Sequence, residues 1–169
     1  MKQELGLRHY TAWQLVKLFW QSEQRSRAFF LFAVTIALTL MLVAFDVVFS
    51  YWFNYFYNAL QEYKVSMALY LLGAFCALAA INIIVSVYRY YLSQLLALRW
   101  RSWLTEQFIG RWLKKRDYYY LETFDKRTDN PDQRIQEDIG ALVSSTLSLV
   151  LGFIGSITTF VAFIYVLWG

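Results

Sequence analysis

The amino-acid sequence predicts an all-α, polytopic membrane protein, and three observations support this fold class. The chain has 169 residues, of which 59% are hydrophobic and 20% aromatic, whereas soluble domains are about 45–50% apolar. Its single Cys cannot form an internal disulfide, which excludes a disulfide scaffold. Three apolar stretches are long enough to cross a bilayer, because about twenty helical residues span the hydrocarbon. We therefore expect transmembrane helices at about residues 28–50, 67–88 and 141–168.

The first span begins with the predominantly apolar run at residues 28–45 and continues past Asp46 into an aromatic-rich segment. A secretory signal is the alternative interpretation. Such a signal has a hydrophobic core of about 7–15 residues followed by a cleavage site of small residues. Because this run is longer and ends among large aromatic side chains, we interpret it as a membrane helix.

The second and third spans contain no charged residue, the latter throughout residues 141–168. A buried helix of a soluble protein is rarely so uniformly apolar over this length. Both runs are therefore interpreted as membrane helices.

The distribution of basic residues predicts the orientation. Of the sixteen Lys and Arg residues, five precede the first span, one (Lys64) lies between the first two spans, and ten lie in residues 89–134. By the positive-inside rule, the N-terminus and the loop at about residues 89–140 are cytoplasmic. We expect a multi-pass protein of the cell inner (plasma) membrane. Topology thus explains the basic charge, and nucleic acid is not an expected partner.

Residues 1–27 are expected to form a cytoplasmic amphipathic elbow. Trp13, Val16 and Trp20 recur at helical spacing, and Lys17 lies between them. Trp-rich amphipathic helices with basic residues favour the lipid interface. The alternative is a helix that packs on a protein partner.

The cytoplasmic loop is expected to prolong the helices of spans two and three. No Gly or Pro occurs at residues 74–109, and apolar residues recur there every three or four positions. This pattern predicts an amphipathic helix that projects about 25–30 Å beyond the lipid at 1.5 Å per residue. A second helix is expected to start at Pro131, with Asn130 as its N-cap and Asp132 at its positive end. The sequence thus predicts two long cytoplasmic helix extensions.

Asp46, Asn54 and Asn58 are possible cavity-lining residues near the outer end of the first span. Ionisable groups within a span often face a polar cavity or a proton path. The alternative is that they lie at the outer membrane interface, within an aromatic belt.

Small residues recur four apart in the third span, at Ser144, Ser148, Gly152 and Ser156. They predict a face on which another helix packs closely, although generic membrane packing explains the same pattern.

Catalytic and metal-binding motifs are absent from the sequence. No G-x-x-x-x-G-K-[ST] phosphate loop occurs, and the single His, His9, has no Cys or carboxylate at ligand spacing. The single Cys, Cys76, lies in the middle of a span, where a thiol is inert. We therefore expect no catalytic residue, no metal site and no cofactor bound by this chain.

Three stretches carry a resemblance to a known family: TDNPDQRIQEDI at residues 128–139, FNYFYNALQ at 53–61, and LRWRSWLTE at 98–106. They resemble the ABC transporters of the fatty-acid-transporter type. This group includes the D-subfamily half-transporters and the bacterial YddA-like and SbmA/BacA-like proteins. The resemblance covers about residues 49–148.

The resemblance implies that residues 28–169 form part of an ABC transporter transmembrane domain, half of a six-helix exporter-type domain. The partners it implies are membrane lipid, the remaining transmembrane helices, an ATP-binding domain of the parent protein that binds ATP and Mg, and a second copy in a homodimer. It also places seven residues at the coupling to the nucleotide-binding domain: Asn130, Pro131, Asp132, Gln133, Arg134, Glu137 and Asp138.

The function expected from this resemblance is that of the N-terminal part of the permease domain of an ATP-driven transporter. Two alternatives remain open at this point. One is part of a proton-coupled, SbmA-like transporter, and the other is a three-span membrane adaptor whose basic cytoplasmic hairpin recruits a partner.

Overall fold

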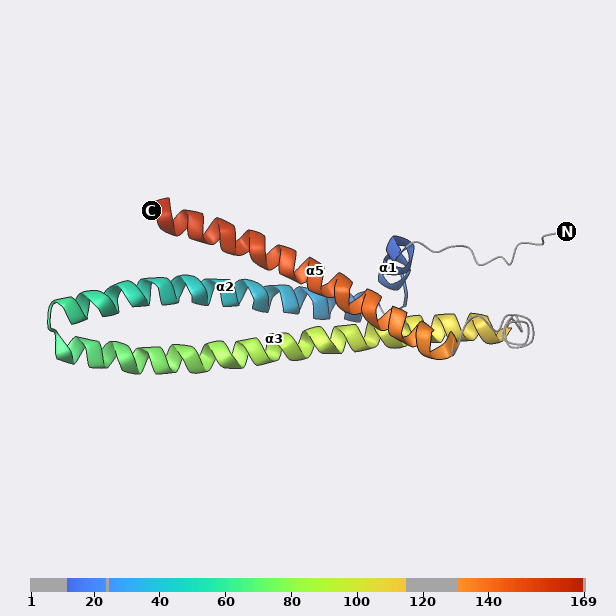
Figure 1. Ribbon diagram of the computed structural model, residues 1–169, viewed down its shortest axis with the longest axis horizontal. Coiled ribbons are helices and arrows are strands. Elements are labelled where there is room, and N and C mark those ends of the chain that lie inside the picture. Colours follow the sequence, from blue (N-terminus) through green and yellow to red (C-terminus); the bar gives the residue numbers. More distant parts are fainter. Residues whose placement is uncertain (1–11, 24, 115–130, 169) are drawn as a thin grey trace. The chain divides into compact units, whose positions relative to one another are not determined.

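The computed structural model describes residues 12–23, 25–114 and 131–168. This part of the chain is helical and contains no strand, which confirms the predicted all-α class. Its helices, shown in Figure 1, are α1 (Ala12–Trp20), α2 (Arg25–Gln61), α3 (Val65–Lys114) and α5 (Pro131–Trp168).

Helices α2, α3 and α5 are each long and apolar enough to cross a membrane, which confirms the polytopic membrane fold. They contain 37, 50 and 38 residues, against about twenty needed for one crossing. Only 28%, 6% and 11% of their most apolar segments are buried within the chain. Most of this apolar surface is therefore left for lipid or for other helices.

Helix α3 is much longer than a membrane crossing requires. At 1.5 Å per residue, its 50 residues measure about 75 Å, against about 30 Å of hydrocarbon. No Pro interrupts it, and the glycines Gly73 and Gly110 lie near its two ends. Helix α5 begins at Pro131, where the sequence predicts a helix start, because proline fits the first helical position.

A tight turn at Tyr63 connects α2 to α3. Tyr63 has a φ of 56°, in the left-handed region that usually requires glycine. The N–H of Lys64 donates to the carbonyl of Ala59 at 2.9 Å, and the N–H of Tyr63 donates to that of Leu60 at 3.1 Å. This pair of bonds is the Schellman pattern that satisfies the last carbonyls of a helix. The short turn returns the chain antiparallel to α2.

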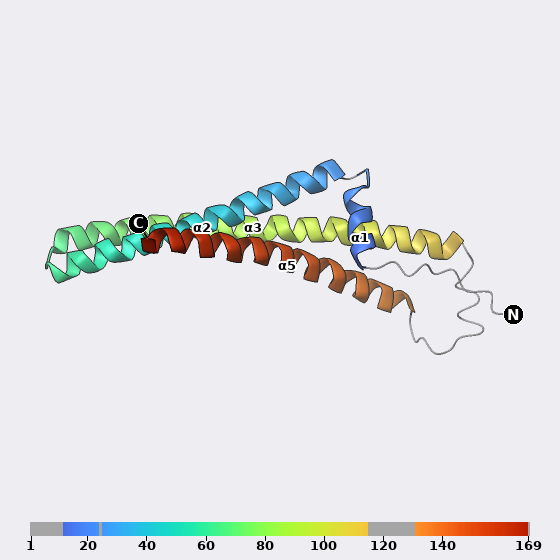
Figure 2. The ribbon, with the colours of Figure 1, turned by 90° about the horizontal axis from the view of Figure 1, so that it is seen from above.

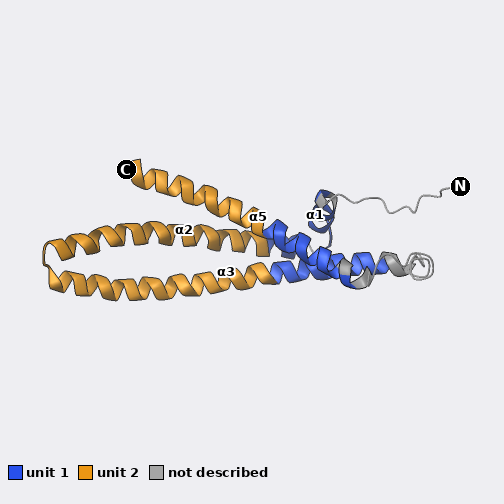
Figure 3. Ribbon diagram, viewed as in Figure 1, with its two compact units in different colours: residues 1–30, 95–147 blue, residues 31–94, 148–169 orange. Residues whose placement is uncertain are grey.

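The chain divides into two compact units, which Figure 3 colours separately. The first comprises residues 1–30 and 95–147. In its described part, the core is formed by side chains from α1, α3 and α5, and those with at most 1% exposure are Phe19, Leu96, Trp100, Leu104 and Val143.

The second unit comprises residues 31–94 and 148–169. Its α2 and α3 segments lie side by side, as both Figure 1 and Figure 2 show. The ring of Trp52 packs against Phe75 with 4.8 Å between ring centroids. A Cβ on Gly155 of α5 would lie 3.6 Å from the methyl group of Thr39, in ordinary van der Waals contact. Gly155 thus marks the approach of α5 to α2.

Candidate functional site

The residues that the resemblance places at the coupling segment lie mostly in the first turns of α5. Asn130 lies outside the described residues, whereas Pro131, Asp132 and Arg134 belong to the helix. The side-chain amide of Gln133 donates a hydrogen bond of 2.9 Å to the Glu137 carboxylate. This bond connects consecutive turns of one helical face and restricts the rotamers of both side chains.

Glu137 and Asp138 are both exposed. Consecutive residues on a helix point about 100° apart. The two carboxylates therefore lie on different sides of the α5 surface. Among the residues whose side chains the structure describes, which leaves out Arg134, neither forms an ion pair. The segment therefore offers two negative charges to a partner surface.

Beside these carboxylates lies an open polar groove of about 520 Å³ in the first unit, between α3 and α5. A Cβ on Gly140 would lie 3.2 Å from the Nη2 atom of Arg101. The Arg101 guanidinium therefore rests on the α5 backbone where a larger residue would meet it. The lining residues are Arg101, Gln133, Gln136, Glu137, Gly140, Ala141 and Ser144.

The groove combines one cation, one carboxylate, two amides and a hydroxyl. Such a surface offers hydrogen bonds to a polar protein segment. Sequence reasoning did not identify Arg101 or Gly140 as a contacting pair, because the contact joins residues 39 positions apart.

Helix α1 packs on α3 through a side chain that the sequence did not single out. Phe19 has 0% exposure, and its ring stacks on Trp100 with 5.2 Å between centroids. Leu15 and Leu18 line a small apolar pocket together with α3 side chains, including Trp103. Trp13, by contrast, is 75% exposed. The apolar face of α1 is thus partly used within the chain, and Trp13 and Lys17 stay exposed.

The candidate cavity residues share one face of α2. Asp46, Asn54 and Asn58 are all exposed, and the side-chain amide of Asn58 donates a hydrogen bond of 2.9 Å to Asn54 Oδ1. Ser50 lies on the same face, between Asp46 and Asn54. Four-residue spacing keeps side chains on one face of a helix. Sequence reasoning missed Ser50, and the spacing from Asp46 is the signal that would have found it.

The small-residue face of α5 is uncovered within the described chain. Ser144, Ser148, Gly152 and Ser156 are all exposed, and nothing lies within 4 Å of a Cβ placed on Gly152. A neighbouring row of apolar residues on α5 is buried within the chain instead. Its members, each at most 7% exposed, are Ile139, Val143, Leu147 and Leu151. Packing against a further helix at the small-residue face stays a prediction.

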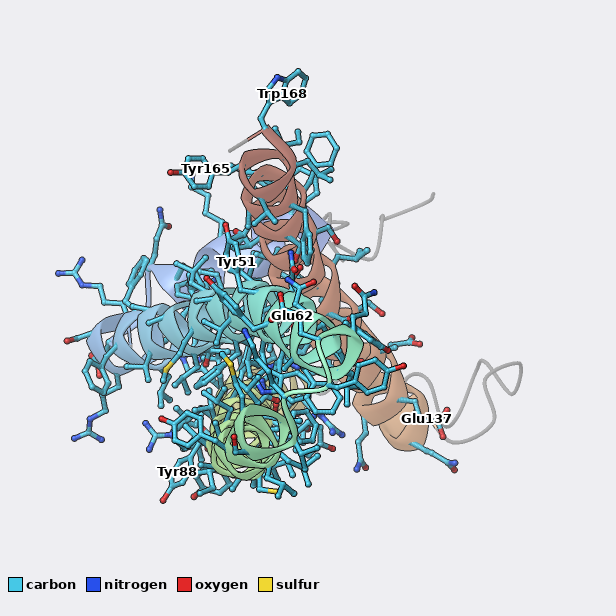
Figure 4. The ribbon with its side chains drawn as sticks, turned by 90° about the vertical axis from the view of Figure 1, so that its left-hand side faces the viewer. Tyr51, Glu62, Tyr88, Glu137, Tyr165 and Trp168 are labelled. Atoms are coloured by element: carbon cyan, nitrogen blue, oxygen red, sulfur yellow. The ribbon has the colours of Figure 1, made fainter. Side chains whose placement is uncertain are left out.

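Large aromatic side chains project from the helices in Figure 4. Tyr88, Tyr165 and Trp168 are 60%, 76% and 87% exposed. Tyr and Trp side chains favour the headgroup level of a membrane, where the ring is apolar and its edge is polar.

Within residues 12–23, 25–114 and 131–168, no three His, Cys, Asp or Glu side chains are close enough to hold a metal ion. Cys76 is exposed on α3.

Comparison with known proteins gives one consistent set of relatives. Residues 15–169 match the family described as ABC transporter transmembrane region 2. The chain is 38% identical over 156 residues to the inner membrane ABC transporter ATP-binding protein YddA of Escherichia coli, a match that covers 91% of this chain and 28% of that protein. It is 31% identical over 154 residues to ABC transporter D family member 2, chloroplastic, of Arabidopsis thaliana, covering 89% of this chain and 21% of the relative.

A shorter match joins the chain to an uncharacterized ABC transporter ATP-binding protein of Synechocystis, with 47% identity over 91 residues, 53% of this chain and 14% of that protein. The chain therefore spans less than a third of the length of each of these relatives. No solved structure matches the chain.

Proposed function

This chain belongs to the ABC transporter transmembrane region 2 family, and we propose that it forms part of the permease of an ATP-driven transporter. The observation that carries the proposal is the family match over residues 15–169, which covers all three span-length helices. Relatives in bacteria and a plant are named as ABC transporters, and those from bacteria as ATP-binding proteins. In this proposal, ATP and Mg bind to a nucleotide-binding domain of the complete protein.

The orientation follows from charge. The basic residues gathered before the first span and in residues 89–134 support a cytoplasmic position for residues 1–27 and for the loop at about residues 89–140. The membrane is the inner (plasma) membrane of the cell. Helix α3, at about 75 Å, then carries its C-terminal part well beyond the lipid, as does the N-terminal part of α5.

The N-terminal segment of α5 is the proposed contact with the nucleotide-binding domain. Its exposed Glu137 and Asp138 carboxylates suit basic or hydrogen-bonding groups on that domain, and Gln133 holds Glu137 in position. Because α5 runs from Pro131 to Trp168, the same helix contains this contact and the third span, and in this proposal it connects them. The contact residues are Asn130, Pro131, Asp132, Gln133, Arg134, Glu137 and Asp138.

Two further surfaces fit a larger assembly. Asp46, Asn54 and Asn58 line the path of the transported molecule in this proposal, because a polar helix face in a membrane turns away from lipid. The small-residue face of α5 receives another helix of the permease, since small side chains let helices approach closely. A second copy of the protein completes the path as a homodimer.

The test replaces Glu137 by Lys in the complete protein, reconstituted in vesicles in a Cys76→Ser background. The reaction rate of a cysteine at Asn58 with an impermeant thiol reagent reports the conformation of the membrane part. We expect ATP to change this rate in the parent protein but not in the Glu137→Lys variant, which still hydrolyses ATP. The matched control is Glu106→Lys, the same charge reversal at an exposed position of α3 outside this contact, which keeps the response.

An unchanged ATP response in Glu137→Lys and Asp138→Lys would contradict the proposed coupling contact. A response of the Asn58 cysteine to a proton gradient, and none to ATP, would contradict an ATP-driven transporter.

A further inference from the structure

The C-terminal half of α2 carries a polar row that the described chain leaves largely exposed. We name Asp46, Ser50, Asn54 and Asn58 the Asp46 row. Each four-residue step turns about 40° around the helix axis, so the four side chains lie within a sector of about 120°. At 1.5 Å per residue the row is about 18 Å long, and it runs from Asp46, within the span expected at about residues 28–50, past the outer end of that span. Ser50 is half-buried, and the other three side chains are exposed.

The Asp46 row continues the face by which α2 packs on α5. Thr35 and Thr39 lie 11 and 7 residues before Asp46. Both spacings are close to a whole number of helical turns, so the two threonines lie on the same side of α2 as Asp46. Both are buried, and their hydroxyls donate to the carbonyls of Leu31 and Thr35 at 2.8 and 2.9 Å. Their polar atoms are therefore satisfied within α2.

The contact between α2 and α5 ends before Asp46. Thr39 meets α5 at Gly155, and beyond this point α5 diverges from α2 toward its C-terminus, as Figure 1 shows within the second unit. Asp46, about 10 Å further along α2 by helical rise, is exposed. This face of α2 is therefore packed against α5 at Thr39 and largely exposed from Asp46 onward.

The carboxylate of Asp46 has no counter-charge in this chain's spans. Residues 67–88 and 141–168 contain no charged side chain. Within the described part of the chain, Asp46 forms no ion pair or side-chain hydrogen bond. A charged side chain in a membrane span faces a water-filled or protein-lined interior rather than lipid. The row therefore presents an uncompensated negative charge to that interior.

We propose that the Asp46 row is a recognition surface for a positively charged group, an amine or a guanidinium, of the transported molecule. This inference rests on the proposed function and adds the substrate class. The carboxylate supplies charge-assisted hydrogen bonds, which are the strong ones. Asn54 and Asn58 are bonded to each other, and their free amide groups, together with the Ser50 hydroxyl, supply further hydrogen bonds along the row. A molecule whose leading group is an anion is repelled.

The experiment tests the charge of the Asp46 row by measuring the reaction rates of two small thiol reagents of opposite charge. In the complete protein with Cys76→Ser, Ser50→Cys is treated with a cationic trimethylammonium methanethiosulfonate and an anionic sulfonate methanethiosulfonate, both impermeant. Each rate is divided by the rate of the same reagent with a free thiol. We expect the cationic reagent to be favoured roughly tenfold, because the Asp46 carboxylate lies one helical turn away.

Two variants connect this preference to the carboxylate. Asp46→Asn removes the charge while keeping the side-chain shape, and it is expected to abolish the preference. Asp46→Glu keeps the charge and is expected to retain it. Val48→Cys is the positional control, because Val48 is 44% exposed but points about 200° away from Asp46. It is expected to react with neither reagent.

A Ser50 cysteine that reacts with neither reagent would overturn the proposal, since the row would then face lipid or packed protein. A preference that persists in Asp46→Asn would overturn it as well. The measurement uses no ATP, so its failure is distinguishable from failure of the proposed ATP coupling, which is read from the Glu137 variants.

Discussion

The indole N–H of Trp52 in α2 donates a hydrogen bond of 2.9 Å to the backbone carbonyl of Leu71 in α3. Trp52 is 8% exposed, and its ring packs against Phe75 of α3 with 4.8 Å between centroids. The side chain thus joins the two antiparallel helices by a polar and an aromatic contact.

Replacing Trp52 by Phe removes the hydrogen bond and keeps most of the aromatic contact. We expect the free energy of unfolding in detergent to fall by about 1 kcal/mol, the usual size of one such bond. Trp168→Phe is the matched control, because Trp168 is 87% exposed, and it is expected to change stability by less than about 0.5 kcal/mol. Equal effects of the two substitutions would contradict a structural role for the Trp52 bond.

Replacing Tyr63 by glycine is expected to stabilise the turn between α2 and α3. A left-handed backbone conformation costs a residue with a Cβ roughly 1–2 kcal/mol, and Tyr63 is 90% exposed, so its side chain contributes little packing. Tyr63→Gly should raise the free energy of unfolding by about 0.5–1 kcal/mol after the extra chain entropy of glycine is subtracted. Lys64→Gly, one residue on, should lower it. A less stable Tyr63→Gly variant would contradict this account of the turn.

The contact between Arg101 and Gly140 predicts that substitutions at the two positions have non-additive effects on the free energy of unfolding. Gly→Ala within a helix gains about 1 kcal/mol, but an added Cβ at Gly140 would lie 3.2 Å from Arg101 Nη2 and must displace the guanidinium. We expect Gly140→Ala to stabilise the protein by about 0.5 kcal/mol more in an Arg101→Ala background than in the parent. Gly73→Ala has nothing within 4 Å and should show no such dependence. A zero coupling energy for Gly140 would contradict the contact.

Phe19 is predicted to anchor α1. Replacing a fully buried Phe by Ala costs about 3 kcal/mol or more, so Phe19→Ala should speed hydrogen exchange of the α1 amides on the order of 100-fold. Trp13→Ala, at a position 75% exposed, should leave exchange nearly unchanged. If Trp13→Ala accelerated exchange more than Phe19→Ala, α1 would be held by its other face.

Local patterns in the sequence were sufficient to predict the spans and the start of α5. An uncharged apolar run of membrane length has few alternative structures, and Pro131 permits a helix start but not a helix interior. Both features depend on residues that are close together in the chain.

Contacts between distant residues could not be predicted in the same way. Periodicity in the nine residues of α1 identifies an apolar face but not which ring is buried, so Trp13 and Trp20 were as plausible as Phe19. The contact between Gly140 and Arg101 depends on the packing of α3 against α5. The Asp46 row was found in part, because Asp and Asn stand out in an apolar run and a serine such as Ser50 does not.

The most direct test of the proposed permease is the side of the membrane on which the N-terminal segment of α5 lies. In a Cys76→Ser background, cysteines at Asn58 and Gln133, both exposed positions, are treated with an impermeant thiol reagent in intact cells. We predict that the Asn58 cysteine reacts at once and that the Gln133 cysteine reacts only after the membrane is permeabilised. The reverse pattern would place the coupling segment outside the cell, where no ATP-binding domain could reach it, and would contradict the account.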